Sequence, residues 1–143
     1  MDFDPTGKYL CSCSEDKMWS VWEIQHKDCQ NKGLIPNFHM RAIYSISWSK
    51  VPLEDSYFIA TAAADNRICV FEINQESLKE QNFQFNVIKK QNMAHDNDIN
   101  CIQFCPQDGS LLASSADDAV IKIWRVSAPE KEEVDEEGDS VMA

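Results

Sequence analysis

The amino-acid sequence predicts an all-β fold made of repeated antiparallel sheets, and three observations lead to that expectation. Three segments share one spacing: a small side chain with a hydroxyl, an aspartate four positions later and an aromatic ten positions later. The third of these segments, "AVIKIWRV", alternates with period two, as half-buried strands do. No stretch has the periodicity of a long amphipathic helix.

The repeat is defined by constant offsets along the chain. All three positions of the first segment lie 49 residues before those of the second, and all three of the second lie 53 residues before those of the third. The three sets are Ser12, Asp16 and Trp22; Thr61, Asp65 and Phe71; and Ser114, Asp118 and Trp124. Such a spacing, found three times, is hard to obtain by chance and indicates one structural unit copied along the chain.

Each unit has the same order of expected elements. A short apolar strand ends at an aromatic residue, namely Phe3, Trp48 or Phe104, and a turn follows it. A second strand then ends in small residues, an acidic tight turn comes next, and a third strand ends at the repeat aromatic. The middle unit carries extra residues at 50–57, a polar segment at 74–85 that we expect to be a surface loop, and a further strand at 85–93.

Four-stranded units of this length, each with an aromatic closing its third strand, resemble the WD-repeat family. The resemblance covers about residues 3–126 and is strongest in the last unit, which has the family's His, Asp and Trp in order. The sequence departs from the family pattern where Ala94 and Phe38 stand for the Gly before His, and where Phe71 stands for Trp. The resemblance implies a partial WD40 β-propeller, about three blades of a seven-bladed propeller with the first blade truncated.

The resemblance predicts that the chain has four parts. Residues 1–37 form a truncated repeat and residues 38–94 a repeat with a loop insertion. Residues 95–126 form the last repeat without its closing strand. Residues 127–143 hold seven acids and one Lys, and this acidic tail is expected to be disordered.

His95, Ser114 and Asp118 are the residue types of a hydrolase triad, which raises catalysis as an alternative. However, His39, Thr61 and Asp65 repeat the same set one unit earlier, and no G-x-S-x-G motif surrounds Ser114. A set of side chains that stabilises the fold should recur in each repeat, whereas an active site need not.

The resemblance implies a buried, hydrogen-bonded structural tetrad instead of an active site. The expected members are His95, Ser114, Asp118, Trp124, His39, Thr61, Asp65, Phe71, Ser12, Asp16 and Trp22. The first unit has no His to face Asp16. No catalytic residue is predicted, and the chain is not expected to be an enzyme.

Composition narrows the possible ligands and partners. The net charge of −11 argues against nucleic acid and anionic membranes, which both require basic patches. Six cysteines show no C-x-x-C and no His pair at zinc spacing, so neither a metal nor a cofactor site is predicted. Free thiols favour the reducing cytosol or nucleus. No signal peptide or membrane-spanning run is evident, and no small-molecule substrate is expected.

The loops beside the tetrad are the expected partner-binding rim. Its candidate residues are Glu15, Lys17, Met40, Arg41, Asn66, Asp96, Asp98 and Asp117. Glu15 and the three aspartates make this rim negative, so we expect a basic or mixed-charge partner segment to dock there. The alternative is that these are only solvated turn residues.

Particular stretches narrow the resemblance further. "AHDNDINCIQFCPQDGSLLASSADD", "IYSISW" with "IATAAADNRICVF", and "LCSCSEDKMWSVW" resemble the last three repeats of the WD-repeat proteins of cytosolic iron–sulfur protein assembly. That resemblance implies a non-catalytic scaffold of the targeting complex, cytoplasmic and also nuclear, which holds no cluster itself. Its partners would be the other subunits of that complex and the client apoproteins. The alternative is a WD-repeat adaptor in an unrelated complex, such as signalling or ubiquitin ligation.

The opening of the chain, "MDFDPTGKYL", aligns with the end of a first strand and the turn after it. We therefore expect about four more units upstream of Met1, because known propellers close with about 4–8 blades. An unclosed stack of sheets exposes edges, so we expect poor stability in isolation.

Overall fold

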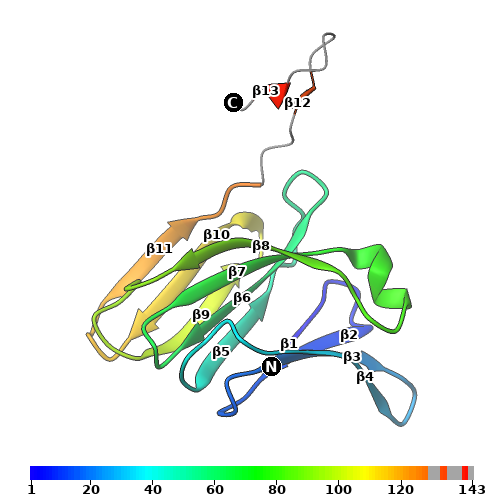
Figure 1. The fold of residues 1–143 in the computed structure, drawn as a ribbon, viewed down its shortest axis with the longest axis horizontal. Helices are drawn as coiled ribbons and strands as arrows, with labels where there is room; N and C mark the ends of the chain where they lie inside the picture. Colours follow the sequence, from blue (N-terminus) through cyan, green and yellow to red (C-terminus); the bar gives the residue numbers. More distant parts are fainter. Residues whose placement is uncertain (129–132, 135–139, 142–143) are drawn as a thin grey trace.

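The computed structural model describes residues 1–128, 133–134 and 140–141 of the 143-residue chain. Its main part consists of three antiparallel sheets that follow one another along the chain (Figure 1). The prediction of an all-β fold of repeated antiparallel sheets is confirmed.

The first sheet has four strands in the order β1-β2-β3-β4. They are β1 (Asp2–Phe3), β2 (Tyr9–Cys13), β3 (Trp19–Ile24) and β4 (Cys29–Ile35). The strand β1 has only two residues, which pair with Cys11 and Leu10 of β2.

The second sheet has four strands in the order β5-β6-β7-β8. They are β5 (Ile43–Trp48), β6 (Tyr57–Ala63), β7 (Ile68–Ile73) and β8 (Phe85–Gln91). The third sheet has three strands, β9 (Ile99–Cys105), β10 (Asp108–Ala116) and β11 (Ile121–Arg125), with β10 in the middle. Within the described residues, no strand pairs with the outer edge of β11.

The prediction of a polar surface loop at 74–85 needs a correction. Residues Gln75–Lys79 form a short 3-10 helix, η1, whose first turn is capped by the Asn74 side chain. Leu78 is fully buried and Phe83 is nearly so. Two apolar residues spaced five apart in a polar segment give no strand or helix period, so their burial depends on the neighbouring first sheet.

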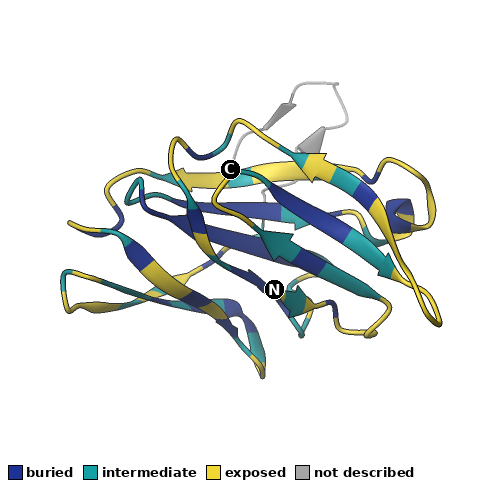
Figure 2. Ribbon diagram, turned by 90° about the horizontal axis from the view of Figure 1, so that it is seen from below, coloured by how far each residue is buried: buried dark blue, intermediate teal, exposed yellow. Residues whose placement is uncertain are grey.

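Two apolar layers hold the three sheets together. Between the first and second sheets, Trp19 packs on Phe71 with ring centroids 4.7 Å apart, and Trp48 and Ile73 join the same cluster. Between the second and third sheets, Ile68 and other β7 and β6 side chains pack against β9 and β10. Figure 2 shows the buried residues along the strands and the exposed ones mainly in the connecting loops. Packing of sheet faces is therefore the main source of stability.

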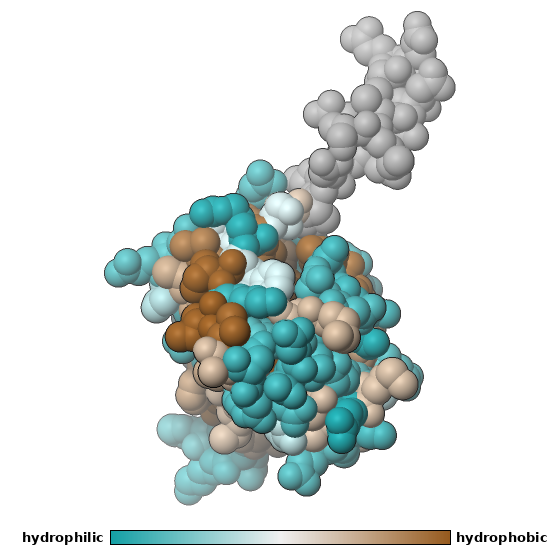
Figure 3. Space-filling view, turned by 90° about the vertical axis from the view of Figure 1, so that its left-hand side faces the viewer, coloured by the Kyte–Doolittle hydropathy of each residue, from teal (hydrophilic) through white to brown (hydrophobic). Residues whose placement is uncertain are grey.

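The third sheet leaves apolar side chains uncovered on the face that turns away from the second sheet. Ile121 and Ile123 are exposed there. Figure 3 views the side of the molecule on which β11 lies and shows strongly hydrophobic side chains gathered there.

Most of the acidic tail predicted to be disordered lies outside the described residues. Within it, the structure describes one pair of short strands, β12 (Glu133–Val134) and β13 (Ser140–Val141).

Candidate functional site

The acidic turns are built in the same way in all three sheets. Asp16, Asp65 and Asp118 each use Oδ1 to accept a hydrogen bond from the backbone N–H two residues later, at 3.0, 3.1 and 2.9 Å. The residue after each aspartate has a positive φ, and Asn66 suits that conformation best. An aspartate is needed here because its short carboxylate closes the turn that joins the second and third strands.

In the third sheet a histidine connects this aspartate to the neighbouring strands. His95 Nδ1 lies 3.0 Å from Asp118 Oδ2, and His95 Nε2 lies 2.7 Å from Ser114 Oγ. The Ser114 hydroxyl also accepts a hydrogen bond from Trp124 Nε1 at 2.8 Å. The structure thus brings these four predicted residues into one continuous hydrogen-bonded set.

The second sheet contains the same arrangement with a shorter chain of bonds. His39 Nδ1 lies 3.0 Å from Asp65 Oδ2, and His39 Nε2 lies 2.7 Å from Thr61 Oγ1. Phe71 has no N–H to donate, and its ring instead packs on Trp19 and Phe38. The aromatic position therefore contributes apolar packing in both sheets and a hydrogen bond in only one.

The first sheet has no histidine at this place. Trp22 Nε1 donates to Ser12 Oγ at 2.9 Å and to Ser20 Oγ at 2.8 Å. Asp16 is exposed and bonds only within its own turn. Ser20 was not predicted from the repeat, and it supplies the second acceptor for the indole.

The sequence did not predict two hydrogen bonds that join the loops carrying His39 and His95 to the aspartates Asp65 and Asp118. Met40 N donates to Asp65 Oδ2 at 2.9 Å, and Asp96 N donates to Asp118 Oδ2 at 3.1 Å. Both donors are the residues directly after the histidine. These are backbone donors, so no side-chain pattern in the sequence could have revealed them.

The charge state of both aspartates follows from these contacts. Burial alone would raise the pKa of Asp65, but hydrogen bonds from His39 and from the N–H groups of Met40 and Arg67 hold it below its ordinary value. Burial likewise acts to raise the pKa of Asp118, and the N–H groups of Val120 and Asp96, together with His95, lower it on balance. Both carboxylates are therefore ionised acceptors near neutral pH.

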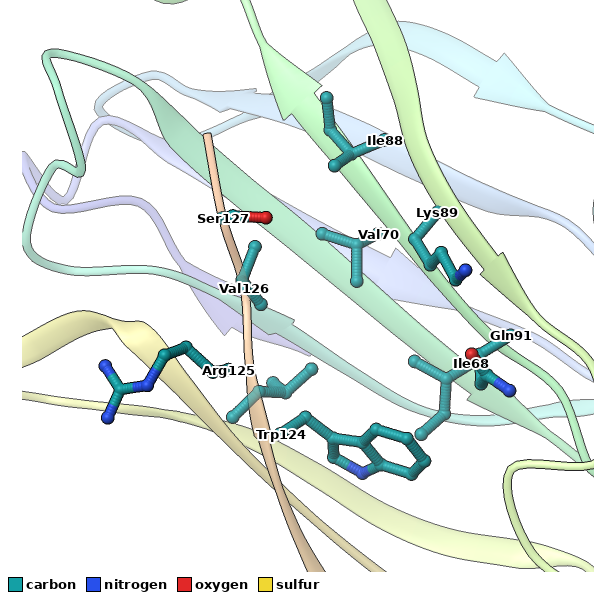
Figure 4. A pocket seen from close by; sticks show the side chains of 10 residues that line it. Ile68, Val70, Ile88, Lys89, Gln91, Trp124, Arg125, Val126 and Ser127 are labelled. Atoms are coloured by element: carbon teal, nitrogen blue, oxygen red, sulfur yellow. The ribbon is translucent and has the colours of Figure 1, made fainter. Parts of the chain in front are cut away.

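The triad-like geometry of His95, Ser114 and Asp118 does not present a nucleophile to substrate. Ser114 and His95 are buried, and the Ser114 hydroxyl is already engaged by Trp124. The groove beside this set, with a volume of about 310 Å³, lies between the second and third sheets and is lined by Trp124, Val70 and Ile88 (Figure 4). His95 and Ser114 do not line it. The arrangement can hold strands together, but it offers no access to an acyl group.

The predicted rim residues lie in the connections at one end of the three sheets. Glu15 and Lys17 are in the β2–β3 turn, Asn66 in the β6–β7 turn and Asp117 in the β10–β11 turn. The remaining four, in the loops before β5 and β9, are Met40, Arg41, Asp96 and Asp98. All are exposed except Asn66 and Asp98, which are half-buried.

Only part of the rim is joined by hydrogen bonds. Asp117 Oδ1 accepts from Asn100 Nδ2 at 2.6 Å, and Asp117 N donates to the Asp98 carbonyl oxygen at 3.0 Å. Asp96 is linked to the same loop through Asp118. An acidic cluster therefore forms at the third sheet, whereas Glu15 and Lys17 belong to the distant first turn. Asn100 was not predicted as part of the rim.

Among the described residues, no group of three or more His, Cys, Asp or Glu side chains could hold a metal ion. No helix in the described part of the chain is long and apolar enough to cross a membrane.

The chain is similar to one protein-family model and to several curated proteins. The family model "WD domain, G-beta repeat" matches residues 1–23 and 87–125. The match leaves out residues 24–86, which contain the 50–57 insertion and Phe71.

Several curated proteins resemble the chain over a large part of its length. A "Probable cytosolic iron-sulfur protein assembly protein Ciao1" of Culex quinquefasciatus is 30% identical over 86% of this chain and 39% of its own length. "Protein CIA1" of Arabidopsis thaliana is 36% identical over 65% of this chain and 25% of its own length. A human "Probable cytosolic iron-sulfur protein assembly protein CIAO1" is 33% identical over 67% of this chain and 27% of its own length. The chain thus spans between a quarter and two fifths of these relatives.

Proposed function

Because the chain is a WD-repeat protein whose curated relatives are named for cytosolic iron–sulfur protein assembly, we propose that it serves as a scaffold in that process. In this role it belongs to the complex that targets iron–sulfur clusters to apoproteins. It binds other subunits of that complex and client apoproteins, works in the cytoplasm and nucleus, and performs no catalysis. The names of the relatives carry the proposal, since fold alone does not assign a function.

The chemistry of the two repeated polar sets supports a scaffold rather than an enzyme. Their histidines and hydroxyls are buried and mutually satisfied, and the same geometry occurs in two sheets. Buried polar groups that satisfy one another stabilise a fold and specify its strand order.

The rim supplies the surface on which partners dock. At the third sheet, Asp96, Asp98 and Asp117 lie on two loops joined by hydrogen bonds, with Asp96 and Asp117 exposed. In the second sheet, Met40 and Arg41 add one exposed apolar and one cationic side chain. A partner segment that carries basic residues flanking an apolar one matches this surface in charge and in contact type.

Affinity capture from cells tests the proposed function directly. The tagged chain, expressed in its cell of origin, is purified at low salt and the bound proteins are identified by mass spectrometry. Recovery of iron–sulfur assembly factors supports the proposal. A reproducible set of partners that lacks those factors contradicts it and favours the alternative, an adaptor in signalling or ubiquitin ligation.

A further inference from the structure

The turn between β6 and β7 carries one arginine that binds the loops on both sides of it. Arg67 Nη1 donates to the Phe38 carbonyl oxygen at 2.7 Å, and Arg67 Nε donates to Asn92 Oδ1 at 2.7 Å. Phe38 lies in the loop before β5 and Asn92 in the loop after β8. Met18 and Val120 occupy the matching position in the other two sheets, and neither side chain can donate a hydrogen bond. This contact is therefore a feature of the second sheet rather than of the repeat.

Backbone hydrogen bonds fix one methionine of each loop beside the same turn. Met40 N donates to Asp65 Oδ2 at 2.9 Å. Ala94 N, directly after Met93, donates to the Asn66 carbonyl oxygen at 2.9 Å. The loop with Met40 comes from the first sheet and the loop with Met93 leads to the third, so the two residues lie on opposite sides of the turn. We call Met40 and Met93 the methionine pair.

Both members of the methionine pair are exposed although they belong to the best-covered sheet. Met40 is 71% exposed and Met93 is 69% exposed. The second sheet packs on both faces against its neighbours, so this exposure does not arise at either end of the chain. The long, polarisable side chain of methionine adapts to apolar surfaces of different shape. Two such side chains on loops held by hydrogen bonds are suited to contact an apolar segment.

The charges beside the methionine pair differ between its two members. Asp96 follows Met93 on the same loop and is exposed, and Asp117 is exposed on the neighbouring β10–β11 turn. On the other side, Arg41 directly follows Met40 and is exposed. A basic residue of a partner is therefore attracted to the side of Met93 and repelled from the side of Met40.

We propose that an extended segment of a partner protein lies across the β6–β7 turn, with one apolar side chain on Met40 and a second on Met93. A basic residue beyond the second apolar side chain contacts Asp96. Arg67 is a positioning residue, because it binds the two loops and not the segment. This inference rests on the proposed function in that it takes the rim as a partner-binding surface, and it adds the order of side chains in the bound segment.

Selection of a phage library of random dodecapeptides on the full chain tests the proposal. We expect the recovered peptides to share two large apolar residues with Lys or Arg beyond one of them. Fluorescence anisotropy of such a peptide measures its affinity, which Met40→Ser with Met93→Ser should weaken at least about tenfold, because two apolar contacts are lost. Recovery of no peptide, or of peptides that bind the parent chain and this variant equally, would overturn the proposal.

A matched control and a charge exchange locate the contact. Ile24→Ser with Val87→Ser removes two exposed apolar side chains from strands outside the rim and should leave peptide binding unchanged. Asp96→Lys should weaken binding, and a peptide with Glu in place of its basic residue should bind this variant better than it binds the parent chain. If the Glu peptide gained nothing on the variant, the position assigned to the basic residue would be wrong.

Replacing Arg67 separates positioning of the methionine pair from support of the fold. Arg67→Met should weaken peptide binding in a chain that circular dichroism shows to be folded. In the variant Met40→Ser with Met93→Ser, the same change should have little further effect, because no apolar contact is left to position. Additive losses in the two backgrounds would show that Arg67 acts on the fold and not through the methionine pair.

Capture from cells distinguishes failure of this inference from failure of the proposed function. If the parent chain and Met40→Ser with Met93→Ser recovered iron–sulfur assembly factors equally, the inference would fail and the proposed function would stand. If the selected peptides bound through the methionine pair but capture returned an unrelated complex, the inference would stand and the proposed function would fail.

Discussion

At the scale of single residues, one aspartate performs two tasks in each complete set. Asp65 closes the turn through Arg67 N and holds both His39 and Met40 N in place. Asp16 performs only the first task, because no histidine faces it. The sequence repeat therefore predicts the turn equally well in all three sheets. The stability that a histidine–aspartate contact adds is expected in only two of them.

Replacing Asp65 tests whether the contact with His39 adds stability beyond closure of the turn. Asp65→Ala leaves buried His39 without its partner, and the loss of such a bond costs about 1–3 kcal/mol. The matched control Asp16→Ala removes the same turn contact without stranding a histidine and should cost distinctly less. Urea unfolding measures both. Equal losses for the two variants would show that His39 gains nothing from Asp65.

The lowered pKa values of Asp65 and Asp118 make stability depend on acid pH. The unfolded carboxyls titrate near their ordinary value of about 3.9, above the folded ones, so the unfolded chain binds more protons in that window. Stability should be full above the ordinary carboxyl range and should fall as pH drops through it toward the lowered values. The melting temperature followed across this range measures the effect.

The variant Asp65→Asn with Asp118→Asn supplies the control for the acid response. It cannot be protonated at these positions, so its melting temperature should change less with pH than that of the parent chain. If the melting temperature of the variant and that of the parent chain changed equally with pH, other carboxylates would be the source of the acid sensitivity.

The cysteines should differ in reactivity, because they differ in burial. Burial raises the pKa of the Cys11 thiol to about 12 and that of Cys69 to about 11, so neither forms a thiolate at neutral pH. Cys29 and Cys101 are exposed. A thiol reagent with mass-spectrometric mapping should modify the exposed pair first, and Cys11 and Cys69 only after unfolding. Early modification of Cys11 would show that the contact between the first and second sheets opens readily.

At the scale of elements, the sequence predicts strands well where the repeat is regular and poorly where tertiary contacts decide. The alternation in β11 and the small residues of β6 and β10 are visible as local patterns. Leu78 and Phe83 are buried in a segment whose composition is that of a surface loop. Their burial arises from side chains of the first sheet, such as Trp19, which lies 6.1 Å from Phe83 between ring centroids. Contacts between distant segments leave no trace in local periodicity.

The insertion at 50–57 contacts the third sheet at Gly109. A Cβ added to Gly109 would overlap the carbonyl group of Val51, so the two backbones approach too closely for any side chain. Gly109→Ala should therefore destabilise the chain by about 1–3 kcal/mol, as overpacking does. Gly7→Asn is the control: Gly7 has a positive φ but open space around it, and Asn tolerates that conformation. A Gly109→Ala variant as stable as this control would mean that the insertion can move away from β10.

At the scale of the whole molecule, three sheets are stacked in series through two apolar clusters. The second sheet is covered on both faces, and the outer sheets on one. The repeat in the sequence predicted the stacked antiparallel sheets and placed His95, Ser114, Asp118 and Trp124 in one repeat unit, where the structure joins them by hydrogen bonds. It did not predict which rim residues form a cluster, because the bonds among Asp98, Asn100 and Asp117 depend on how two loops meet.

The proposed binding of partners through the acidic rim is tested most directly by reversing charges there. Asp96→Lys with Asp98→Lys changes two rim charges, and Glu76→Lys with Glu80→Lys makes the same change at exposed positions on and beside η1. Capture of partner proteins at low salt, quantified for both variants and the parent chain, should fall at least about tenfold for the rim variant and stay unchanged for the control. Equal capture by the rim variant and the parent chain would contradict the claim that this rim binds partners.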